Sequence, residues 1–306
     1  MTTDSAPTVT AVIATRDRPE LLAEAVASVL DQAYAGAIEV IIVFDQAPVR
    51  PELAMDSPGR TVRVLANARS TGLAGARNTG IDAAGGDVIA FCDDDDIWVP
   101  DKLARQVPRL MADGVVLAVG GIRIRYGDVQ RERIPPGGRI EGSDLASSRV
   151  TGSHPSTFVI RRAALEGTLG LVDEEIPYGY GEDYDLLLRA AKVGAIAVVP
   201  AVLAVVLWHP GSYFARRWPA MIDGLGYLLA KHPELAADRR GRAWIEGQRA
   251  FAMAADGRRL AAARTAVTSL RLNPREPRGP LALLVAARLL SAERVLRALN
   301  ARGRGI

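Results

Sequence analysis

Four short apolar runs, each ending at a polar residue or followed directly by one, limit most strongly how this chain of 306 residues folds. The runs occupy residues 8–15, 38–45, 61–67 and 87–92. Strands that are apolar throughout are buried on both faces, and helix-like segments follow the first and third runs, so this order predicts a mainly parallel sheet covered by helices. Right-handed crossovers bring the strand ends and the loops after them to one edge. We therefore expect four polar residues to meet there: Thr15, Asp45, Asn67 and Asp93.

The helix after the first run is expected to begin with a capping box. Asp17 is a suitable N-cap, and Glu20 follows three residues later as its partner. Pro19 stands in the first turn, where its missing N–H costs nothing.

The pattern after Pro100 is mixed. We expect a strand at residues 115–127, a loop at 131–144, a strand leading into a helix at 156–165, and a helix at 181–194. The longest apolar run, Val193–Trp208, is valine-rich and interrupted by Pro200. It is shorter than the roughly 20 residues that a membrane-spanning helix needs, so it predicts two buried strands around a turn.

From Pro219 onward the chain is rich in Ala, Leu and Arg and is expected to be helical. Two amphipathic segments, residues 257–274 and 278–300, predict a small helical pair. We place a boundary near Arg216–Pro219, which divides an α/β domain of residues 1–216 from a basic C-terminal helical region of residues 217–306.

The charges are distributed unevenly along the chain. From Lys231 onward there are 16 basic and 6 acidic residues, which leaves 22 of the 38 basic and 29 of the 35 acidic residues before it. Such a basic tail suits peripheral contact with anionic lipid headgroups, although a solvated helical surface accounts for it equally well. We expect no nucleic-acid partner.

Cys92 is the only cysteine, which excludes an internal disulfide and fits a reducing compartment. The first residues contain no basic segment followed by an apolar run, so no signal peptide is expected. A cytoplasmic location follows, with the inner face of the membrane as the place of any peripheral contact.

Four consecutive aspartates, Asp93 to Asp96, follow the fourth apolar run. Like charges at the end of a buried strand need a compensating cation. Carboxylates at alternate positions, here Asp93 and Asp95, can share one Mg²⁺ or Mn²⁺ and leave its other positions open for water and a diphosphate. The alternative is a solvated acidic loop.

Five segments resemble, in order and in spacing, the signature blocks of glycosyltransferase family 2. They are residues 12–30, 39–47, 67–81, 91–103 and 181–194. The resemblance extends from Thr8 to Tyr213. It implies the Rossmann-like GT-A fold, with a nucleotide-sugar half at about residues 8–100 and an acceptor half at about residues 101–216. It also implies a nucleoside-diphosphate sugar as donor, Mn²⁺ or Mg²⁺ as cofactor, and inversion at the anomeric carbon.

The resemblance assigns donor-binding residues to this chain. Thr15 and Arg16 match the loop that lines the nucleotide base. Asp45 matches one member of a paired-Asp block, and Phe44 replaces the other member, which leaves the identity of the base open. Asn67 and Arg77 match positions beside the nucleotide, where a guanidinium can bond phosphate or base oxygens.

The same resemblance assigns the metal site and the catalytic pair. In the Asp-x-Asp block, Asp95 matches the direct metal ligand, Asp93 a residue near ribose and metal, and Asp94 the residue between them. Glu182 and Asp183 match a Glu-Asp pair at a helix start, and Asp183 is the expected base for the acceptor hydroxyl. Apart from the resemblance, both carboxylates would also compensate the helix dipole.

Further candidates carry two interpretations each. His209 matches a position near the metal or diphosphate, or is a histidine in a turn. Tyr178 and Tyr180 stack on sugar rings or pack in the protein. His154 faces the acceptor or is structural, and Trp98 is expected to pack in the core or at the rim rather than to contact a ligand.

These features favour transfer of one sugar per encounter. Phe214–Trp218 has Phe where the Gln-x-x-Arg-Trp motif of processive synthases has Gln. A sugar-nucleotide pyrophosphorylase would need a glycine-rich basic loop after the first strand, and residues 14–20 contain no glycine. A non-catalytic nucleotide-sugar-binding protein on the same fold is the other alternative. The acceptor is left open as a small molecule, a glycan or a lipid-linked saccharide.

Overall fold

The structure is a computed structural model that describes residues 6–150, 152–208 and 217–300. Four parallel strands form the N-terminal half of its central sheet, as the apolar runs predict. The carboxyl ends of three of them are level, because Thr15 pairs with Phe44 and Phe44 with Ala66, whereas the fourth strand ends earlier, with Phe91 opposite Val12. These strands are β1 (Val9–Thr15), β2 (Ile38–Phe44), β4 (Arg60–Ala66) and β5 (Val88–Phe91).

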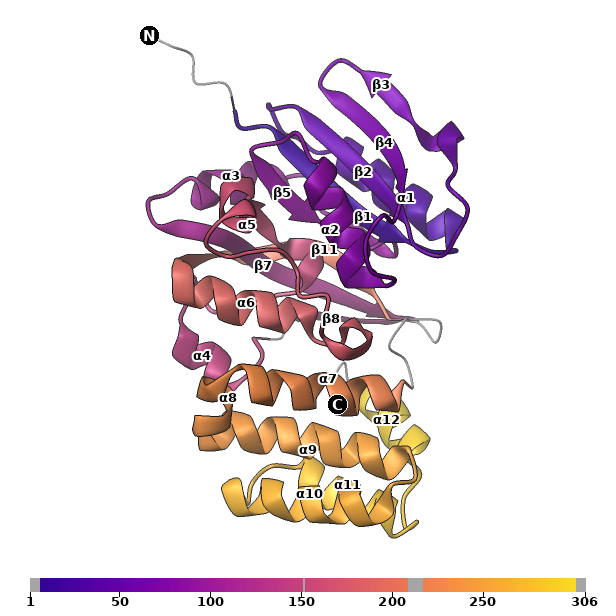
Figure 1. Ribbon diagram of the computed structural model, residues 1–306, viewed down its shortest axis with the longest axis vertical. Coiled ribbons are helices and arrows are strands. Elements are labelled where there is room, and N and C mark those ends of the chain that lie inside the picture. Colours follow the sequence, from indigo (N-terminus) through magenta and orange to yellow (C-terminus); the bar gives the residue numbers. More distant parts are fainter. Residues whose placement is uncertain (1–5, 151, 209–216, 301–306) are drawn as a thin grey trace.

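The other half of the sheet is mixed in direction. Its strands are β6 (Asp96–Trp98), β7 (Val115–Tyr126), β8 (Val129–Arg133), β9 (Gly138–Ile140), β10 (Val159–Arg161) and β11 (Ala195–Leu207), and β3 (Met55–Ser57) lies at the opposite edge. The order is β3-β4-β2-β1-β5-β10-β7-β11-β6, with β8 paired to β7 and β9 to β11. The end of the sheet with β3 and β4 lies at the top of Figure 1. The loop expected at residues 131–144 is therefore wrong in part, because β8 and β9 pair with long neighbouring strands.

The apolar run that ends at Trp208 forms one strand, β11, and not two strands around a turn. Its parallel pairing with β7 continues across Pro200 through a bulge, in which the register shifts between Val199 and Val202. Proline has no N–H to donate, so it is tolerated at such an unpaired position. Gly121 on β7 leaves room, since a Cβ there would lie 2.9 Å from the carbonyl oxygen of Ala201.

Helices cover both faces of the sheet. On one face the core includes apolar side chains of α1 (Pro19–Leu30) and α3 (Lys102–Leu110). On the other face it includes those of α2 (Leu73–Ala83) and α6 (Glu182–Val193). Successive strand residues alternate between the two cores, so β1 must be apolar throughout. The predicted class, a mainly parallel sheet flanked by helices with a C-terminal helical region, is confirmed.

The predicted capping box of α1 is wrong. Arg18, not Asp17, is the N-cap residue, and its side chain forms no capping hydrogen bond. Pro19 opens the helix and needs no cap for its own nitrogen.

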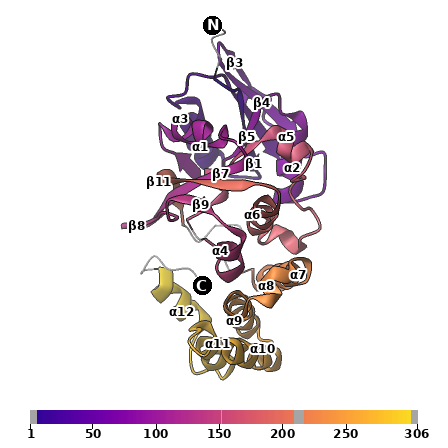
Figure 2. The same ribbon diagram turned by 90° about the vertical axis from the view of Figure 1, so that its left-hand side faces the viewer.

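The C-terminal region contains more helices than the predicted pair. Figures 1 and 2 show them stacked beyond α6, away from β3. They are α7 (Trp218–Lys231), α8 (Pro233–Ala237), α9 (Arg239–Ala255), α10 (Arg259–Leu272), α11 (Arg278–Ala286) and α12 (Ala292–Asn300). Short helices elsewhere are α4 (Gly142–Ser147), α5 (Arg162–Glu166) and the 3-10 helices η1 (Pro51–Leu53), η2 (Pro155–Thr157) and η3 (Pro177–Gly179). Within the described residues, every helix is too short or too polar to cross a bilayer.

Candidate active site

A cavity of about 280 Å³ opens at the carboxyl ends of β1, β2 and β5. Several residues with an expected role in donor or metal binding line it together: Thr15, Arg16, Asp45, Asp93, Asp94 and Asp95. His154, for which an acceptor-facing or a structural role is expected, also lines it. The last residues of β11 and Trp208 close another side. The structure therefore brings together residues from strand ends that lie far apart in the sequence.

Asp45 is held at the cavity by the loop after β4. Asn67 donates its Nδ2 to Asp45 Oδ1 at 2.8 Å, and the backbone nitrogen of Gly72 donates to Asp45 Oδ2 at 3.1 Å. The hydroxyl of Thr79 in turn donates to Asn67 Oδ1 at 2.8 Å. Asn67 therefore orients Asp45. The replaced family position, Phe44, is buried in the core.

Two of the four aspartates are compensated by an arginine that the sequence interpretation had not singled out. Arg18 approaches Asp94 Oδ1 to 2.7 Å with its Nη2 and forms an ion pair with Asp95 through its Nη1. Thr15 donates its hydroxyl to Asp94 Oδ2 at 2.7 Å. Burial raises the pKa of Asp94 to about 6, against the opposing effects of Arg18 and Thr15.

The described carboxylates and imidazole that could hold one metal ion together are Asp93, Asp96 and His154, whose ligand atoms lie within 4.8 Å of one another. His154 Nδ1 lies 3.3 Å from Asp96 Oδ2. Two carboxylates and an imidazole are donors that suit Mn²⁺, and the carboxylates alone suit Mg²⁺. The residues present therefore fit the implied metal, but Asp96 and His154 stand in this group in place of the expected Asp95.

Burial affects the ionisation of this group. It raises the pKa of Asp96 well above its usual value, an effect that Asp93 and Asp95 reinforce. It lowers the pKa of His154, which favours the neutral imidazole that binds metals. Ser156 positions the group, since it donates its hydroxyl to Asp96 Oδ2 at 2.5 Å and accepts from the backbone nitrogen of Asp93 at 3.0 Å.

Glu182 and Asp183 form the first turn of α6. The N-cap, Gly181, has φ 91°, a left-handed conformation that favours glycine. Glu182 is buried and forms an ion pair with Arg77, which also contacts Asp93 Oδ1 at 2.6 Å. Burial raises the pKa of Glu182 to about 8, although Arg77 opposes the shift. Arg77 therefore links the aspartate run to the start of α6.

Asp183 pairs with a different arginine, Arg149, which lies in the segment after α4. Burial alone would raise the pKa of Asp183, but the charge of Arg149 outweighs it and the net shift is downward. Among the described residues, Glu182, Asp183 and Arg77 are not part of the cavity wall. His154, which is, interacts electrostatically with both Asp93 and Asp183.

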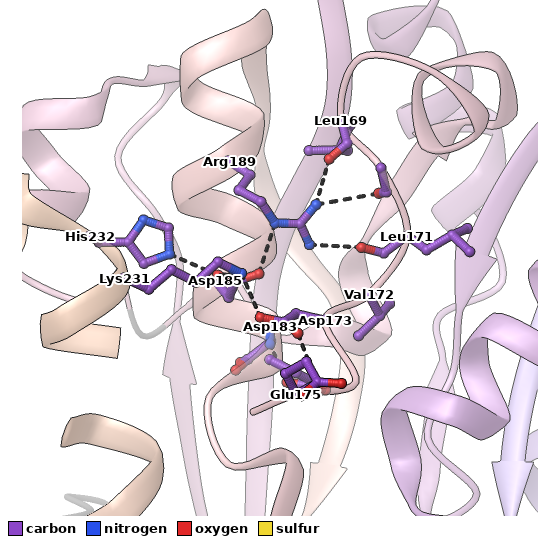
Figure 3. A network of polar contacts seen from close by, with 12 residues as sticks. Leu169, Leu171, Val172, Asp173, Glu175, Asp183, Asp185, Arg189, Lys231 and His232 are labelled. Carbon is purple, nitrogen blue, oxygen red and sulfur yellow. Dashed lines mark hydrogen bonds and ion pairs between the residues drawn. The ribbon is translucent and has the colours of Figure 1, made fainter. Parts of the chain in front are cut away.

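Asp185, two residues further along α6, is the centre of a buried polar network (Figure 3). Its Oδ1 lies 2.7 Å from both Lys231 Nζ and His232 Nε2 at the end of α7, and Arg189 Nε donates to its Oδ2 at 2.8 Å. Arg189 also donates to the carbonyl oxygens of Leu169, Gly170 and Leu171. The network fixes α6 to the preceding loop and to the C-terminal helices.

The remaining candidates are placed as follows. Tyr178 is 58% exposed, and Tyr180 packs against the core. Trp98 is a buried core residue, as one of its two interpretations expects. His209 and residues 214–216 of the compared Gln-x-x-Arg-Trp position lie outside the described residues.

Sequence reasoning missed three residues of this site, Arg18, Arg149 and Asp185, and it named Asp96 only as a member of the aspartate run. The charge argument did point to a cation beside the aspartates, and an arginine three residues beyond the first strand end was available to it. No signal in the sequence pairs Arg149 with Asp183, or Asp185 with His232, because these partners lie 34 and 47 residues apart.

Known protein families and proteins resemble this chain in sequence and in fold. The model of glycosyl transferase family 2 matches residues 10–169. Succinoglycan biosynthesis protein ExoO of Rhizobium meliloti (strain 1021) is 32% identical over 274 residues, which cover 79% of this chain and 77% of that protein. The Escherichia coli UDP-Glc:alpha-D-GlcNAc-diphosphoundecaprenol beta-1,3-glucosyltransferase WfgD is 28% identical, over 58% of this chain and 67% of its own.

Solved structures share the fold at low sequence identity. S. aureus TarS 1-349 in complex with UDP-GlcNAc has a TM-score of 0.58 at 15% identity and covers 97% of this chain and 92% of its own. Mannosyltransferase PcManGT from Pyrobaculum calidifontis in complex with GDP-Man and Mn²⁺ has a TM-score of 0.55 at 16% identity, with 97% and 87% covered. With a family model that matches more than half of it, this chain belongs to glycosyl transferase family 2 and is a glycosyltransferase with the GT-A fold.

Proposed function

We propose that this protein is an inverting, metal-dependent glycosyltransferase that moves one sugar from a nucleoside-diphosphate sugar to an acceptor hydroxyl by single displacement. The observation that carries the proposal is Arg77, which contacts Asp93 in the aspartate run and Glu182 at the start of α6. Single displacement needs a base held opposite the leaving diphosphate. The buried Arg77 keeps the aspartate run and the start of α6, which carries the proposed base, in a fixed relation.

The donor nucleotide occupies the cavity at the strand ends. Thr15, Arg16 and Asp45 line the cavity, and Asn67 orients Asp45. Arg77 acts indirectly, by orienting Asp93. Two structures of the same fold support a nucleotide-sugar donor, since one holds UDP-GlcNAc and the other GDP-Man with Mn²⁺.

Mn²⁺ or Mg²⁺ is the expected cofactor. Asp93, Asp96 and His154 would hold it, with Asp95 and the undescribed His209 as the further ligands that the family resemblance implies. Bound there, the ion would stabilise the negative charge that develops on the leaving diphosphate.

Asp183 is the proposed base, and Glu182 supports it. The acceptor oxygen bonds to the anomeric carbon as the bond to the diphosphate breaks, and Asp183 takes the hydroxyl proton. The lowered pKa of Asp183 keeps it ionised at neutral pH. Glu182 accepts the bond from Arg77 and so holds the first turn of α6 in place.

The acceptor half is proposed at residues 101–216, after a donor half at 8–100 and before the helical region 217–306. The acceptor is a small molecule, a glycan or a lipid-linked saccharide. The WfgD relative, named for a diphosphoundecaprenol-linked acceptor, supports the last of these. Peripheral membrane contact through the basic C-terminal helices would then bring enzyme and acceptor together.

A donor-hydrolysis panel tests the function. UDP-, GDP- and dTDP-sugars are incubated with Mn²⁺ or Mg²⁺, and free nucleoside diphosphate is measured for the wild type, Asp95→Ala, Asp96→Asn and Asp183→Asn. We expect metal-dependent release from one donor, with a loss in Asp95→Ala or Asp96→Asn that identifies the ligand set. Transfer to an acceptor should fall by about 10²- to 10⁴-fold in Asp183→Asn.

Asp101→Asn is the matched control, because Asp101 is an exposed carboxylate that pairs with Arg105. It should leave hydrolysis unchanged. If the wild type releases nucleoside diphosphate from no donor yet binds one by calorimetry, the chain is a nucleotide-sugar-binding protein and the proposal fails.

A further inference from the structure

One arginine contacts the proposed base, and another contacts the wall of the cavity. Arg149 forms an ion pair with Asp183 while its side chain is still 32% exposed. Arg133, the last residue of β8, places its guanidinium carbon 5.2 Å from the centre of the Trp208 ring. Trp208 is part of the cavity wall, so Arg133 lies beside the proposed donor site and Arg149 beside the base.

The fold holds these two like charges close to one another. Burial lowers the pKa of Arg133, and the charge of Arg149 lowers it further, as expected for neighbouring cations. The backbone after Arg149 packs tightly on the end of β8, since a Cβ on Gly152 would lie 2.8 Å from the carbonyl oxygen of Arg133. In the same segment Ser153 is buried, and its hydroxyl has no hydrogen-bond partner within the described residues.

This pairing has a consequence for the chemistry at Asp183. An acceptor hydroxyl must reach the Asp183 carboxylate, and Arg149 already bonds it. An anionic group on the acceptor would draw the guanidinium of Arg149 away and leave Asp183 available as the base. Guanidinium groups bind phosphate oxygens in bidentate fashion, and two such groups match a phosphate better than they match a neutral sugar.

We propose that Arg149 and Arg133 bind an anionic, phosphate-type group of the acceptor, next to the hydroxyl that Asp183 deprotonates. The inference rests on the proposed function and names its acceptor class. In the transfer step the acceptor oxygen forms its bond to the anomeric carbon, the bond from that carbon to the donor diphosphate breaks, and the hydroxyl proton passes to Asp183. The acceptor anion replaces Asp183 as the ion-pair partner of Arg149 and undergoes no chemical change.

The test is a binding titration that does not depend on knowing the acceptor sugar. Protein saturated with the nucleoside diphosphate found in the donor panel, and with Mn²⁺, is titrated with methyl phosphate by calorimetry. Arg149→Gln and Arg133→Gln should each weaken binding by about 10- to 100-fold, the range for a charge-assisted hydrogen bond. Asp183→Asn should strengthen binding, because it frees Arg149. Arg131→Gln, an exposed arginine on the same strand, should have no effect.

Two further arms identify the source of the anion. Methyl glucuronide in place of methyl phosphate tests a carboxylate-bearing acceptor, and an alkyl diphosphate tests a lipid-linked one. Stronger binding of the diphosphate supports the lipid-linked source, and stronger binding of the glucuronide would overturn the phosphate class.

Donor hydrolysis on the same samples separates the two proposals. If the wild type hydrolyses a donor but binds methyl phosphate no better than Arg149→Gln does, the acceptor inference is wrong and the function stands. Weaker binding in Asp183→Asn would also overturn it, since Arg149 would then serve only to balance the charge of Asp183. If no donor is hydrolysed, the proposed function fails and the acceptor inference fails with it.

Discussion

Arg77 and Glu182 form an ion pair that is almost closed to solvent, with side chains 3% and 5% exposed. The two residues come from α2 and α6, on the same face of the sheet. If one side chain is removed, the charge of the other stays buried and cannot be solvated by water.

At about pH 9, where Glu182 with its pKa of about 8 is ionised, we expect Arg77→Gln to destabilise the fold by about 3–5 kcal/mol, because it leaves the Glu182 carboxylate buried without its cation. Adding Glu182→Gln should restore a large part of that loss, since no uncompensated charge then remains at this pair. Urea unfolding of the two single variants and the double variant measures the coupling. Strictly additive losses would show that the pair is not coupled.

Asp185→Asn is expected to cost a similar amount, about 3–5 kcal/mol, because it removes the charge that Lys231, His232 and Arg189 surround. Asp101→Asn, at an exposed pair, should change stability by less than about 0.5 kcal/mol. Thermal unfolding at neutral pH compares the two variants.

The Asp185 network also predicts how stability depends on pH. Burial alone would raise the pKa of Asp185, but the hydrogen bonds from His232 and Lys231 and the charge of Arg189 lower it below the unfolded value. Stability from this group is therefore fully present above about pH 4 and is lost as the pH falls through the native pKa. Asp185→Asn should flatten this acid limb of the unfolding curve, and an unchanged limb would exclude the network as its cause.

Lys102 gives a prediction of opposite sign. Its side chain is fully buried, and its Nζ lies 3.9 Å from the centre of the Trp98 ring. Within the described residues this Nζ has no hydrogen-bond partner. Burial lowers the pKa of Lys102 to about 7, partly opposed by Cys92. Between about pH 7 and 10 the unfolded chain therefore binds a proton that the native protein does not, so stability should rise with pH in that window.

Lys102→Met should accordingly stabilise the protein by about 1–3 kcal/mol at pH 6–7, with a smaller gain toward pH 10. Urea unfolding at several pH values measures the difference. A loss of stability at pH 7 would mean that the contact between the ammonium and the Trp98 ring outweighs the cost of burial.

Arg18→Ala tests the compensation of the aspartate run. The guanidinium of Arg18 forms ion pairs with Asp94 and Asp95, so it competes with any metal ion that would bind these carboxylates. Its removal should tighten Mn²⁺ binding in the absence of nucleotide on the order of tenfold, the effect of removing one nearby positive charge. Arg105→Ala, at an exposed pair, is the control. Weaker Mn²⁺ binding in Arg18→Ala would instead show that Arg18 holds the aspartates in their binding arrangement.

The sequence predicts the strands well because burial on both faces leaves uninterrupted apolar runs, as in β1 and β2. It also predicts which strand ends meet, because parallel strands share an edge. It fails at Pro200, where proline commonly marks a break. Whether the strand continues there depends on a neighbouring strand that leaves room for a bulge.

The candidate site also has a part that the sequence predicts and a part that it does not. Asp93 and Asp183 follow local patterns, a strand end and a helix start. Arg149 and His154 become part of the site only through the folded path of the segment between β9 and β10, which has no periodic pattern of its own. Side-chain partners of this kind depend on tertiary packing, so they cannot be predicted from one sequence alone.

The Asp185 network has a consequence for the order in which the chain folds during its synthesis. On the ribosome the N-terminal strands and α6 emerge before residues 231 and 232, so the nascent α6 carries a carboxylate whose partners Lys231 and His232 have not yet been synthesised. Domains tend to fold as they emerge, N-terminal parts first. Here the half of the enzyme that carries the proposed base cannot complete its interior until the last third of the chain arrives. The end of α7 therefore supplies the last partners of a carboxylate in α6, and packing around α6 is complete only once residues 231 and 232 are available.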